Sequence, residues 1–281
     1  MSKASVTSSR SASLKRSWEL LEQANALMPA GTQTMSKRPN QFARGLTPAF
    51  LERGQGCHVT DVDGHTYLDY SMALCAAVLG YNDPTVNAAI QRQLASGISF
   101  SLPHPLEVAL ADRLTKLIPC AEMVRFVKNG SDATAGAVRV ARAYTARDRI
   151  AVCGYHGAQD WYVGTTSWKA GIPRATQALS HTFHYNNLGS LDEVLERHLG
   201  EFAAVIMEPV GVIPPEADFL QQVITHAHRH GALVIFDEII TGFRLRLGGA
   251  QEFFGVVPDL ACFGKAMANG MPLAALVGRR E

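Results

Sequence analysis

The sequence predicts an α/β protein with a mostly parallel sheet and helices on both of its faces. Short apolar runs, typical of buried strands, alternate with segments whose apolar residues recur at helical spacing. The composition, 47% hydrophobic and 18% charged, is that of a globular protein. Such alternation is typical of three-layer domains. The strands are expected at 124–127, 149–153, 203–207, 233–236 and 260–263, and the helices at 133–144, 191–199 and 219–230.

The N-terminal part shows a different pattern. Apolar residues recur at helical spacing over 14–27, and Pro29 helps to end this helix. The stretch 57–70 alternates around Asp63-Gly64, a pair suited to a tight hairpin turn. We therefore expect a flexible tail over 1–17, an N-terminal helix, small antiparallel ribbon and connecting segment over 18–100, and the α/β domain over 101–281.

Charge and cysteine usage narrow the function classes. Twenty-six basic and 25 acidic residues give a net charge of +1, so nothing favours nucleic acid or a membrane surface as partner. No apolar run reaches the ~20 residues of a membrane-spanning helix. Five cysteines without C-x-x-C spacing indicate a reducing, cytoplasmic location. The Ser-rich N-terminus is compatible with an organellar transit peptide, but we favour a frayed tail.

Candidate site residues are sought where strands end, because ligands of parallel α/β sheets collect at the carboxyl ends of the strands. After the first predicted strand, Gly130 and Ser131 begin a helix of small residues. Free backbone N–H groups and the Ser131 hydroxyl would hold a phosphate there. An Asn-Gly turn followed by a serine N-cap is the alternative, and this segment alone favours it. The Gly-Lys-Ser/Thr element of a Walker loop is missing.

Polar residues also follow the next three major strands. Tyr155 and His156 follow the second strand, where a flat ligand ring could stack on Tyr155, although both are also ordinary turn residues. Glu208 follows the third strand. Asp237 and Glu238 follow the fourth, where a buried carboxylate needs a partner.

Three histidines, His226, His228 and His230, raise the question of a metal. His226 and His230 are four residues apart and could in principle bind zinc. They lie at the end of a predicted helix, where the helix dipole favours a solvated C-terminal turn. We therefore expect no metal site.

Lys265 directly follows the last predicted strand. Lysine is rarely placed deep in an α/β sheet, because desolvation lowers the pKa of the amine and makes it nucleophilic. A phosphate cradle, a stacking aromatic ring, an aspartate and a lysine are together what pyridoxal phosphate (PLP) requires. The lysine binds its aldehyde as a Schiff base, and the aspartate keeps its pyridine nitrogen protonated. The sequence therefore predicts PLP as cofactor, with Lys265 and Asp237 as catalytic residues.

Two longer stretches resemble the signature of class III aminotransferases, which belong to the fold type I PLP superfamily. They are ALVIFDEIITGFR at 232–244 and PDLACFGKAMANGMP at 258–272. Within that class the sequence is most similar to glutamate-1-semialdehyde 2,1-aminomutase, and the resemblance begins at about residue 20. It implies the large PLP-binding domain of fold type I. Shorter matches lie at 106–111, 124–127, 141–148, 248–251 and 277–280.

Carried over residue by residue, the resemblance implies a role for each candidate. Lys265 would form the Schiff base and shuttle a proton between the Cα and C4′ carbons. Asp237 would pair with the pyridine nitrogen. Ile239 would pack against one face of the ring and Tyr155 against the other.

The remaining cofactor contacts are implied in the same way. Gly130 and Ser131 would bind the phosphate, although the family more often has Ser-Gly-Thr where this chain has Asn129-Gly130-Ser131. His156 and Glu208 would orient the ring and its hydroxyl.

Substrate-facing loops depart from the aminomutase pattern. The mutase usually has Asn-Ser-Pro-Val-Arg where this chain has Gln33-Thr-Met-Ser-Lys37, which makes Thr34 and Lys37 the substrate-binding candidates. Lys37 keeps the charge of arginine but not its bidentate fork. The loops at 161–173 and 210–214 are also shorter. We therefore expect an aminotransferase acting on a small-molecule amino donor and a keto or aldehyde acceptor, with the aminomutase as the alternative.

The resemblance has two implications for the assembly. Family members build each active site from two subunits, so a homodimer is expected. They are also longer, so we expect the C-terminal small domain to be absent from these 281 residues. A truncated, non-catalytic binding or assembly protein is the second alternative.

Overall fold

The computed structural model describes residues 13–281, which form two compact units. The first unit comprises residues 13–72 and 79–93, and the second comprises 73–78 and 94–281. Most of the expected tail, residues 1–12, lies outside the described residues, and the first helix already begins at Lys15. Among residues 13–281, none of the helices combines the length and the apolar character needed to cross a membrane.

The first unit is built from the predicted helix and a three-stranded antiparallel sheet. The carboxylate of Asp63 accepts hydrogen bonds from the backbone N–H groups of Arg16 and Ser17, each at 2.9 Å, and so satisfies free donors at the start of α1. The elements are α1 (Lys15–Leu27), the 3-10 turns η1 (Pro29–Gly31), η2 (Met35–Lys37) and η3 (Pro39–Gln41), the strands β1 (Leu51–Gln55), β2 (His58–Asp61) and β3 (Thr66–Leu68), and most of α3 (Pro84–Ser96).

The predicted ribbon is present, and β1 extends it to three strands. Gly64 has a φ of +91°, as a tight turn between β2 and β3 requires. Asp61 is fully buried and accepts hydrogen bonds from the N–H groups of Asp63 (2.9 Å) and His65 (2.8 Å) and from the Tyr67 hydroxyl (2.8 Å). These bonds fix the turn that the Asp-Gly pair predicted.

The second unit surrounds a seven-stranded mixed sheet with the order β4-β10-β9-β8-β7-β5-β6. The strands from β5 to β9 are parallel to their neighbours within that group, and β10 is antiparallel to both β4 and β9. Five of the seven were predicted. The bounds are β4 (Met123–Val127), β5 (Arg149–Cys153), β6 (Ser180–Thr182), β7 (Phe202–Met207), β8 (Leu233–Asp237), β9 (Leu260–Phe263) and β10 (Ala274–Gly278).

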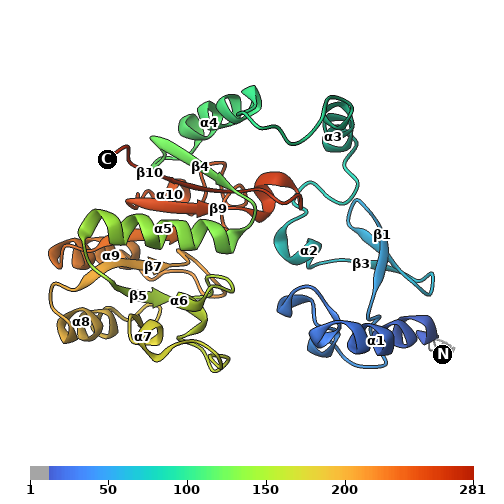
Figure 1. Cartoon of the computed structure of the whole chain (residues 1–281), viewed down its shortest axis with the longest axis horizontal. Coiled ribbons are helices and arrows are strands. Elements are labelled where there is room, and N and C mark those ends of the chain that lie inside the picture. Colours follow the sequence, from blue (N-terminus) through green and yellow to red (C-terminus); the bar gives the residue numbers. More distant parts are fainter. Residues whose placement is uncertain (1–12) are drawn as a thin grey trace, which may run out of the picture. The chain divides into compact units, whose positions relative to one another are not determined.

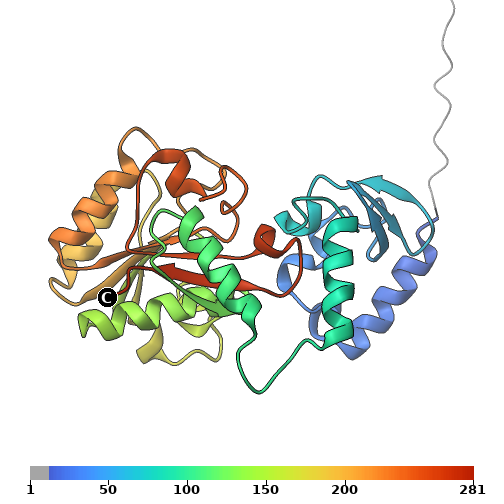
Figure 2. The ribbon, with the colours of Figure 1, turned by 90° about the horizontal axis from the view of Figure 1, so that it is seen from above.

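Helices cover both faces of this sheet, as predicted. Alternate strand residues point to opposite faces: Ile150 and Val152 pack with α5, whereas Ala151 and Cys153 belong to the cluster that contains α8 and α9. Figure 2 shows the sheet between α9, in orange, and α5, in yellow-green. The helices are α4 (Pro105–Leu117), α5 (Gly130–Thr145), α6 (Asp160–Val163), α7 (Arg174–Gln177), α8 (Leu188–Arg197), α9 (Phe219–Arg229), α10 (Ala250–Phe254) and the 3-10 helix η4 (Lys265–Ala268).

The short segment α2 (Met72–Cys75) has a left-handed backbone. Its four residues have φ values of 45°, 54°, 56° and 69°, and none of them is glycine. A non-glycine residue in this conformation costs roughly 1–2 kcal/mol, so four in succession need contacts that hold them. One such contact comes from Arg244, whose guanidinium donates a hydrogen bond to the carbonyl oxygen of Cys75 at 2.6 Å.

Candidate active site

The sheet order brings five predicted cofactor residues of the second unit to one edge. Strands β5, β7, β8 and β9 are consecutive neighbours and parallel, so their carboxyl ends lie together (Figure 1). Tyr155 and His156 follow β5, Glu208 follows β7, Asp237 ends β8, and Lys265 follows β9. This edge is where an α/β sheet offers a ligand site.

Asp237 is held on both oxygens of its carboxylate. Its Oδ2 lies 2.8 Å from Nδ1 of His156, and its Oδ1 accepts a hydrogen bond from the N–H of Ile239 at 3.1 Å. The residue is only 4% exposed. A buried carboxylate without partners is costly, and these two contacts supply them. The position of the carboxylate is therefore fixed.

His156 is the rigid support of Asp237. The imidazole is buried, and its Nε2 lies 3.0 Å from the carbonyl oxygen of Cys153. Its ring stacks on Trp161 with centroids 6.1 Å apart, and Tyr162 meets it edge-on at 5.5 Å. With both nitrogens engaged and two aromatic neighbours, the ring has one orientation.

The neighbouring acid, Glu238, has a different set of partners. Its fully buried carboxylate accepts hydrogen bonds from the Thr241 hydroxyl (2.6 Å), the N–H groups of Ala250 (2.6 Å) and Gln251 (3.0 Å), and the Gln251 side-chain amide (3.2 Å). Burial raises the pKa of Glu238, and these donors oppose the rise. Of the two adjacent acids, Glu238 therefore fastens the following loop.

Lys265 is half-buried directly after β9 and has a left-handed φ of 42°. Burial lowers the pKa of its amine, while the negative charges of Asp237 and Glu208 oppose this shift. A lowered pKa leaves a larger fraction of the amine unprotonated at neutral pH. This is the environment that a nucleophilic lysine requires.

The start of α5 is capped by Asn129, so the alternative that made Ser131 the N-cap is wrong. Oδ1 of Asn129 accepts a hydrogen bond from a backbone N–H in the first turn at 3.0 Å. Ser131 Oγ instead accepts from the N–H of Ala158 at 3.1 Å. This bond ties the start of α5 to the loop after β5.

Three glycines permit close approaches around Ile239 and Ser131. A Cβ on Gly130 or Gly264 would lie 3.0 Å or 3.1 Å from the Ile239 side chain. Gly157 has a φ of +103°, and a Cβ there would collide with the Ser131 hydroxyl oxygen. Larger side chains would displace the loops that meet at this edge.

Tyr155 and Glu208 are joined by a backbone hydrogen bond. The N–H of Tyr155 donates to Oε2 of Glu208 at 3.0 Å. Burial raises the pKa of Glu208, and this bond opposes the rise. The Tyr155 side chain is 56% exposed and contacts Tyr162 edge-on at 5.5 Å. More than half of this side chain is therefore accessible to a ligand.

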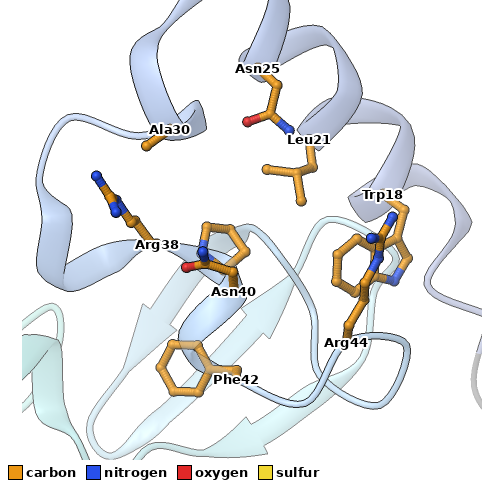
Figure 3. Close-up of a pocket in the computed structure, with 9 residues that line it drawn as sticks. Trp18, Leu21, Asn25, Ala30, Arg38, Asn40, Phe42 and Arg44 are labelled. Carbon is orange, nitrogen blue, oxygen red and sulfur yellow. The ribbon is translucent and has the colours of Figure 1, made fainter.

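Thr34 and Lys37, the predicted substrate residues, lie in the first unit, before and within η2. The same unit has a pocket of about 430 Å³, which neither of them lines. Figure 3 shows this pocket, with Arg44 over the Trp18 ring, 5.7 Å from its centroid. The part of Thr34 and Lys37 in substrate binding stays a prediction.

Two of the three clustered histidines pair with separate carboxylates. Nδ1 of His226 lies 2.5 Å from Asp192, and Nε2 of His228 lies 2.8 Å from Asp259. Over residues 13–281, no group of three or more His, Cys, Asp and Glu side chains could hold a metal ion. These pairs connect helices and strand ends of the second unit.

Two residues at this edge gave no recognisable signal in the sequence. The Thr134 hydroxyl donates to the carbonyl oxygen of His156 at 2.9 Å, and Arg244 contacts Cys75. Thr134 is one small polar residue in a helix of small residues. Arg244 is one charge in an exposed loop, so only the folded chain reveals either contact.

The arrangement fits PLP. The Lys265 amine suits an aldehyde, the buried Asp237 carboxylate suits a protonated pyridine nitrogen, and the N-terminus of the 16-residue helix α5, with Ser131, suits a phosphate. Gly130 and Gly264 keep the space beside Ile239 free of side chains. The fold is that of fold type I PLP-dependent proteins, and these residues fit the cofactor of that superfamily.

Comparison with known proteins gives the family. The class III aminotransferase family matches residues 41–281, and the chain belongs to this PLP-dependent family. The 3-aminobutyryl-CoA aminotransferase of Cloacimonas acidaminovorans is 44% identical over 275 residues, which cover 95% of this chain and 66% of that protein. The glutamate-1-semialdehyde 2,1-aminomutase of Roseiflexus castenholzii is 41% identical over 282 residues, 95% of this chain and 64% of that protein.

A solved structure of a transaminase with PLP bound shows the same fold. It is 30% identical in sequence and has a TM-score of 0.87, and the match covers 95% of this chain and 65% of that chain. The sequence therefore spans between 64% and 66% of the length of these three proteins.

Proposed function

We propose that this chain forms the cofactor-binding part of an aminotransferase, which moves an amino group from a small-molecule amino donor to a keto or aldehyde acceptor. One observation carries the proposal: the buried Asp237–His156 pair and the half-buried Lys265 amine stand at the ends of the neighbouring strands β8 and β9. Bound PLP supplies an aldehyde for the lysine and a ring that accepts electrons from the substrate carbon.

Lys265 and Asp237 take the two catalytic roles. The Lys265 amine would hold the cofactor and, as a free amine, would carry a proton between the substrate carbon and the cofactor. Its lowered pKa keeps a fraction of the amine ready for both tasks. The Asp237 carboxylate holds a proton on the ring nitrogen, and His156 keeps that carboxylate in place.

The other candidates position the cofactor. The N–H groups at the start of α5 and the Ser131 hydroxyl bind the phosphate. Ile239 and Tyr155 enclose the two faces of the ring, and Glu208 orients the ring hydroxyl. The exposed Tyr155 ring and the confined Ile239 side chain support these assignments.

An aminomutase that transfers the amino group within one molecule is the second candidate. The 41% identity to a glutamate-1-semialdehyde 2,1-aminomutase favours it. The 44% identity to an aminotransferase, and Lys37 where the mutase pattern has arginine, favour transfer between two molecules. A keto product released from the amino donor supports the aminotransferase, whereas conversion of a single substrate without release supports the mutase.

We also propose a homodimer as the working form. The stretch from the end of α3 to the first turn of α4 carries apolar side chains that are more than half exposed, and such surfaces mark interfaces. They are Leu94, Ile98, Phe100, Leu102, Leu106 and Val108.

We propose a cytoplasmic location because the thiols of Cys120, Cys153 and Cys262 are free and buried in apolar surroundings, as is typical of reduced cysteines.

Absorption spectroscopy tests the assignment of Lys265. The purified protein mixed with PLP is expected to develop a visible absorption band, and Lys265→Ala is expected to abolish it. Lys169→Ala, which removes an exposed lysine elsewhere in the second unit, is the control and should leave the band intact. A band that survives in Lys265→Ala, or that never forms in the unmodified chain, would contradict the proposal.

A further inference from the structure

We propose that Arg244 is a positioning residue, which clamps the left-handed turn 73–75 beside the cofactor lysine. This rests on the proposed role of Lys265. The turn belongs to the second unit, and in both views α2 lies beside the red η4 helix, which begins with Lys265 (Figures 1 and 2). Arg244 thereby joins two segments that are 169 residues apart in sequence.

The turn needs an external support. Ala73, Leu74 and Cys75 all have positive φ values, and none of them has the freedom of glycine. A backbone in this conformation persists only where the surroundings hold it. Strained segments of this kind cluster at active sites and ligand clamps, which is the context found here.

Arg244 is suited to supply that support. Its Nη2 donates to the carbonyl oxygen of Cys75 at 2.6 Å, and its Nε donates to the carbonyl oxygen of Ile240 at 3.1 Å. The second bond fixes the guanidinium on its own loop, so that the first can hold the turn. The planar fork of arginine makes both bonds at once, which a lysine ammonium on a flexible stem does less well.

The loop that carries Arg244 is itself anchored to the catalytic edge. It follows Asp237 directly, and the buried Glu238 carboxylate accepts hydrogen bonds from the Thr241 hydroxyl in this loop and from two N–H groups at the start of α10, where the loop ends. The turn is therefore connected to the end of β8 through Arg244 and the loop that carries it. A shift of this loop would move both the turn and Asp237.

Electrostatics supports the same placement. Burial is the largest influence on the pKa of the Lys265 amine and lowers it; Asp237, Cys75 and Glu208 raise this pKa, and the charge of Arg244 lowers it. Releasing the turn would admit water to the amine and weaken that burial. Both effects would raise the pKa of Lys265, so Arg244 keeps the amine in its reactive form.

Hydrogen exchange in the protein without cofactor tests the clamp directly. The reporters are the N–H groups of Ala76 and Val78, which donate within the turn to Ala73 and Ala76. In Arg244→Gln and in Arg244→Lys their exchange is expected to rise about tenfold or more, as loss of a charge-assisted hydrogen bond predicts. Arg246→Gln, an exposed arginine of the same loop, is the matched control and should exchange like the unmodified protein.

Three outcomes would overturn the clamp: unchanged exchange in Arg244→Gln, exchange in Arg244→Lys equal to that of the unmodified protein, or a rise in exchange across the whole second unit with a lower urea midpoint.

A spectroscopic readout complements this test. In the PLP-loaded protein, the pH at which the visible band titrates should move upward in Arg244→Gln and stay in place in Arg246→Gln. If no band forms even in the unmodified protein, the proposed function fails, while the exchange result still decides the clamp.

Discussion

The strand-end edge of the second unit and the 29–44 segment of the first unit are built in different ways. At the strand-end edge, His156 and Asp237 are buried and pair across 81 positions of the sequence. In the 29–44 segment, three short 3-10 turns follow one another, and a typical bond, from the Gln41 side chain to the carbonyl of Met35, spans six positions.

We expect this difference to separate the two proposed tasks, cofactor binding at the strand-end edge and substrate recognition in the 29–44 segment. Long-range contacts between buried groups fix geometry to within a narrow range, which a cofactor shared by a whole family needs. Local contacts in exposed turns tolerate changes of sequence, which suits the recognition of different substrates. Substitutions in the two regions should therefore alter different measured quantities.

The largest effect is expected from Asp237→Asn. The amide keeps the size of the side chain but loses the charge that holds a proton on the ring nitrogen, so kcat should fall by about 10²- to 10⁴-fold. Asp192→Asn, which disturbs the more exposed pair of Asp192 with His226, is the control and should change kcat less than about twofold. Equal losses in the two variants would remove the distinction drawn for the strand-end edge.

An intermediate effect is expected from Gly157→Ala. The new methyl group would collide with the Ser131 hydroxyl oxygen, and the φ of +103° is unfavourable for alanine. The cost should be about 1–3 kcal/mol in the free energy of unfolding, with weaker PLP binding.

Gly171→Ala separates the two causes of that loss. Gly171 has a φ of +85° and nothing within 4 Å of the added carbon, so this variant reports the backbone cost alone. Urea titration of both variants, together with PLP titration by absorption, makes the comparison. If Gly171→Ala weakened PLP binding as much, the Ser131 contact would not matter.

The smallest effect is expected from Lys37→Ala. It should raise the KM of a carboxylate substrate about tenfold, equivalent to roughly 1.4 kcal/mol, and leave PLP affinity unchanged. Lys15→Ala, which removes an exposed lysine of α1, serves as the control. Steady-state kinetics and a PLP titration distinguish the two regions, since a loss of PLP affinity in Lys37→Ala would contradict the division of tasks.

The parts of the fold that sequence predicted are those with a strong local pattern. The five apolar strands and the helices α5, α8 and α9 carry their own periodicity, and the Asp63-Gly64 turn carries its own chemistry. Strand β10 was missed because Ala274 and Ala275 are weak strand residues. They are part of a strand because both pair with β4 and Ala275 also pairs with Phe263 of β9, and these partners lie elsewhere in the chain. The helices α3 and α4 were also not anticipated, since both are largely exposed.

The site shows the same limit. Lys265, Asp237, His156 and Glu208 could be named because each lies at the end of a recognisable strand or within three residues of it. What each one touches could not be derived, because Ser131 bonding to Ala158 depends on two loops meeting in space. The different roles of Asp237 and Glu238 likewise follow from their partners in the folded chain. Asp237 contacts His156, whereas Glu238 accepts hydrogen bonds from Thr241 and Ala250.

The antiparallel position of β10 has a consequence for biosynthesis. Within residues 13–281, strand β4, which leads to the proposed phosphate-binding turn, pairs only with β10, and β10 also pairs with β9, which leads to Lys265. About 150 residues separate β4 from its partner, so on the order of ten to thirty seconds of translation pass before the two can meet. During that interval β4 has no strand partner in the nascent chain, and its backbone N–H and C=O groups are open to pairing with another chain.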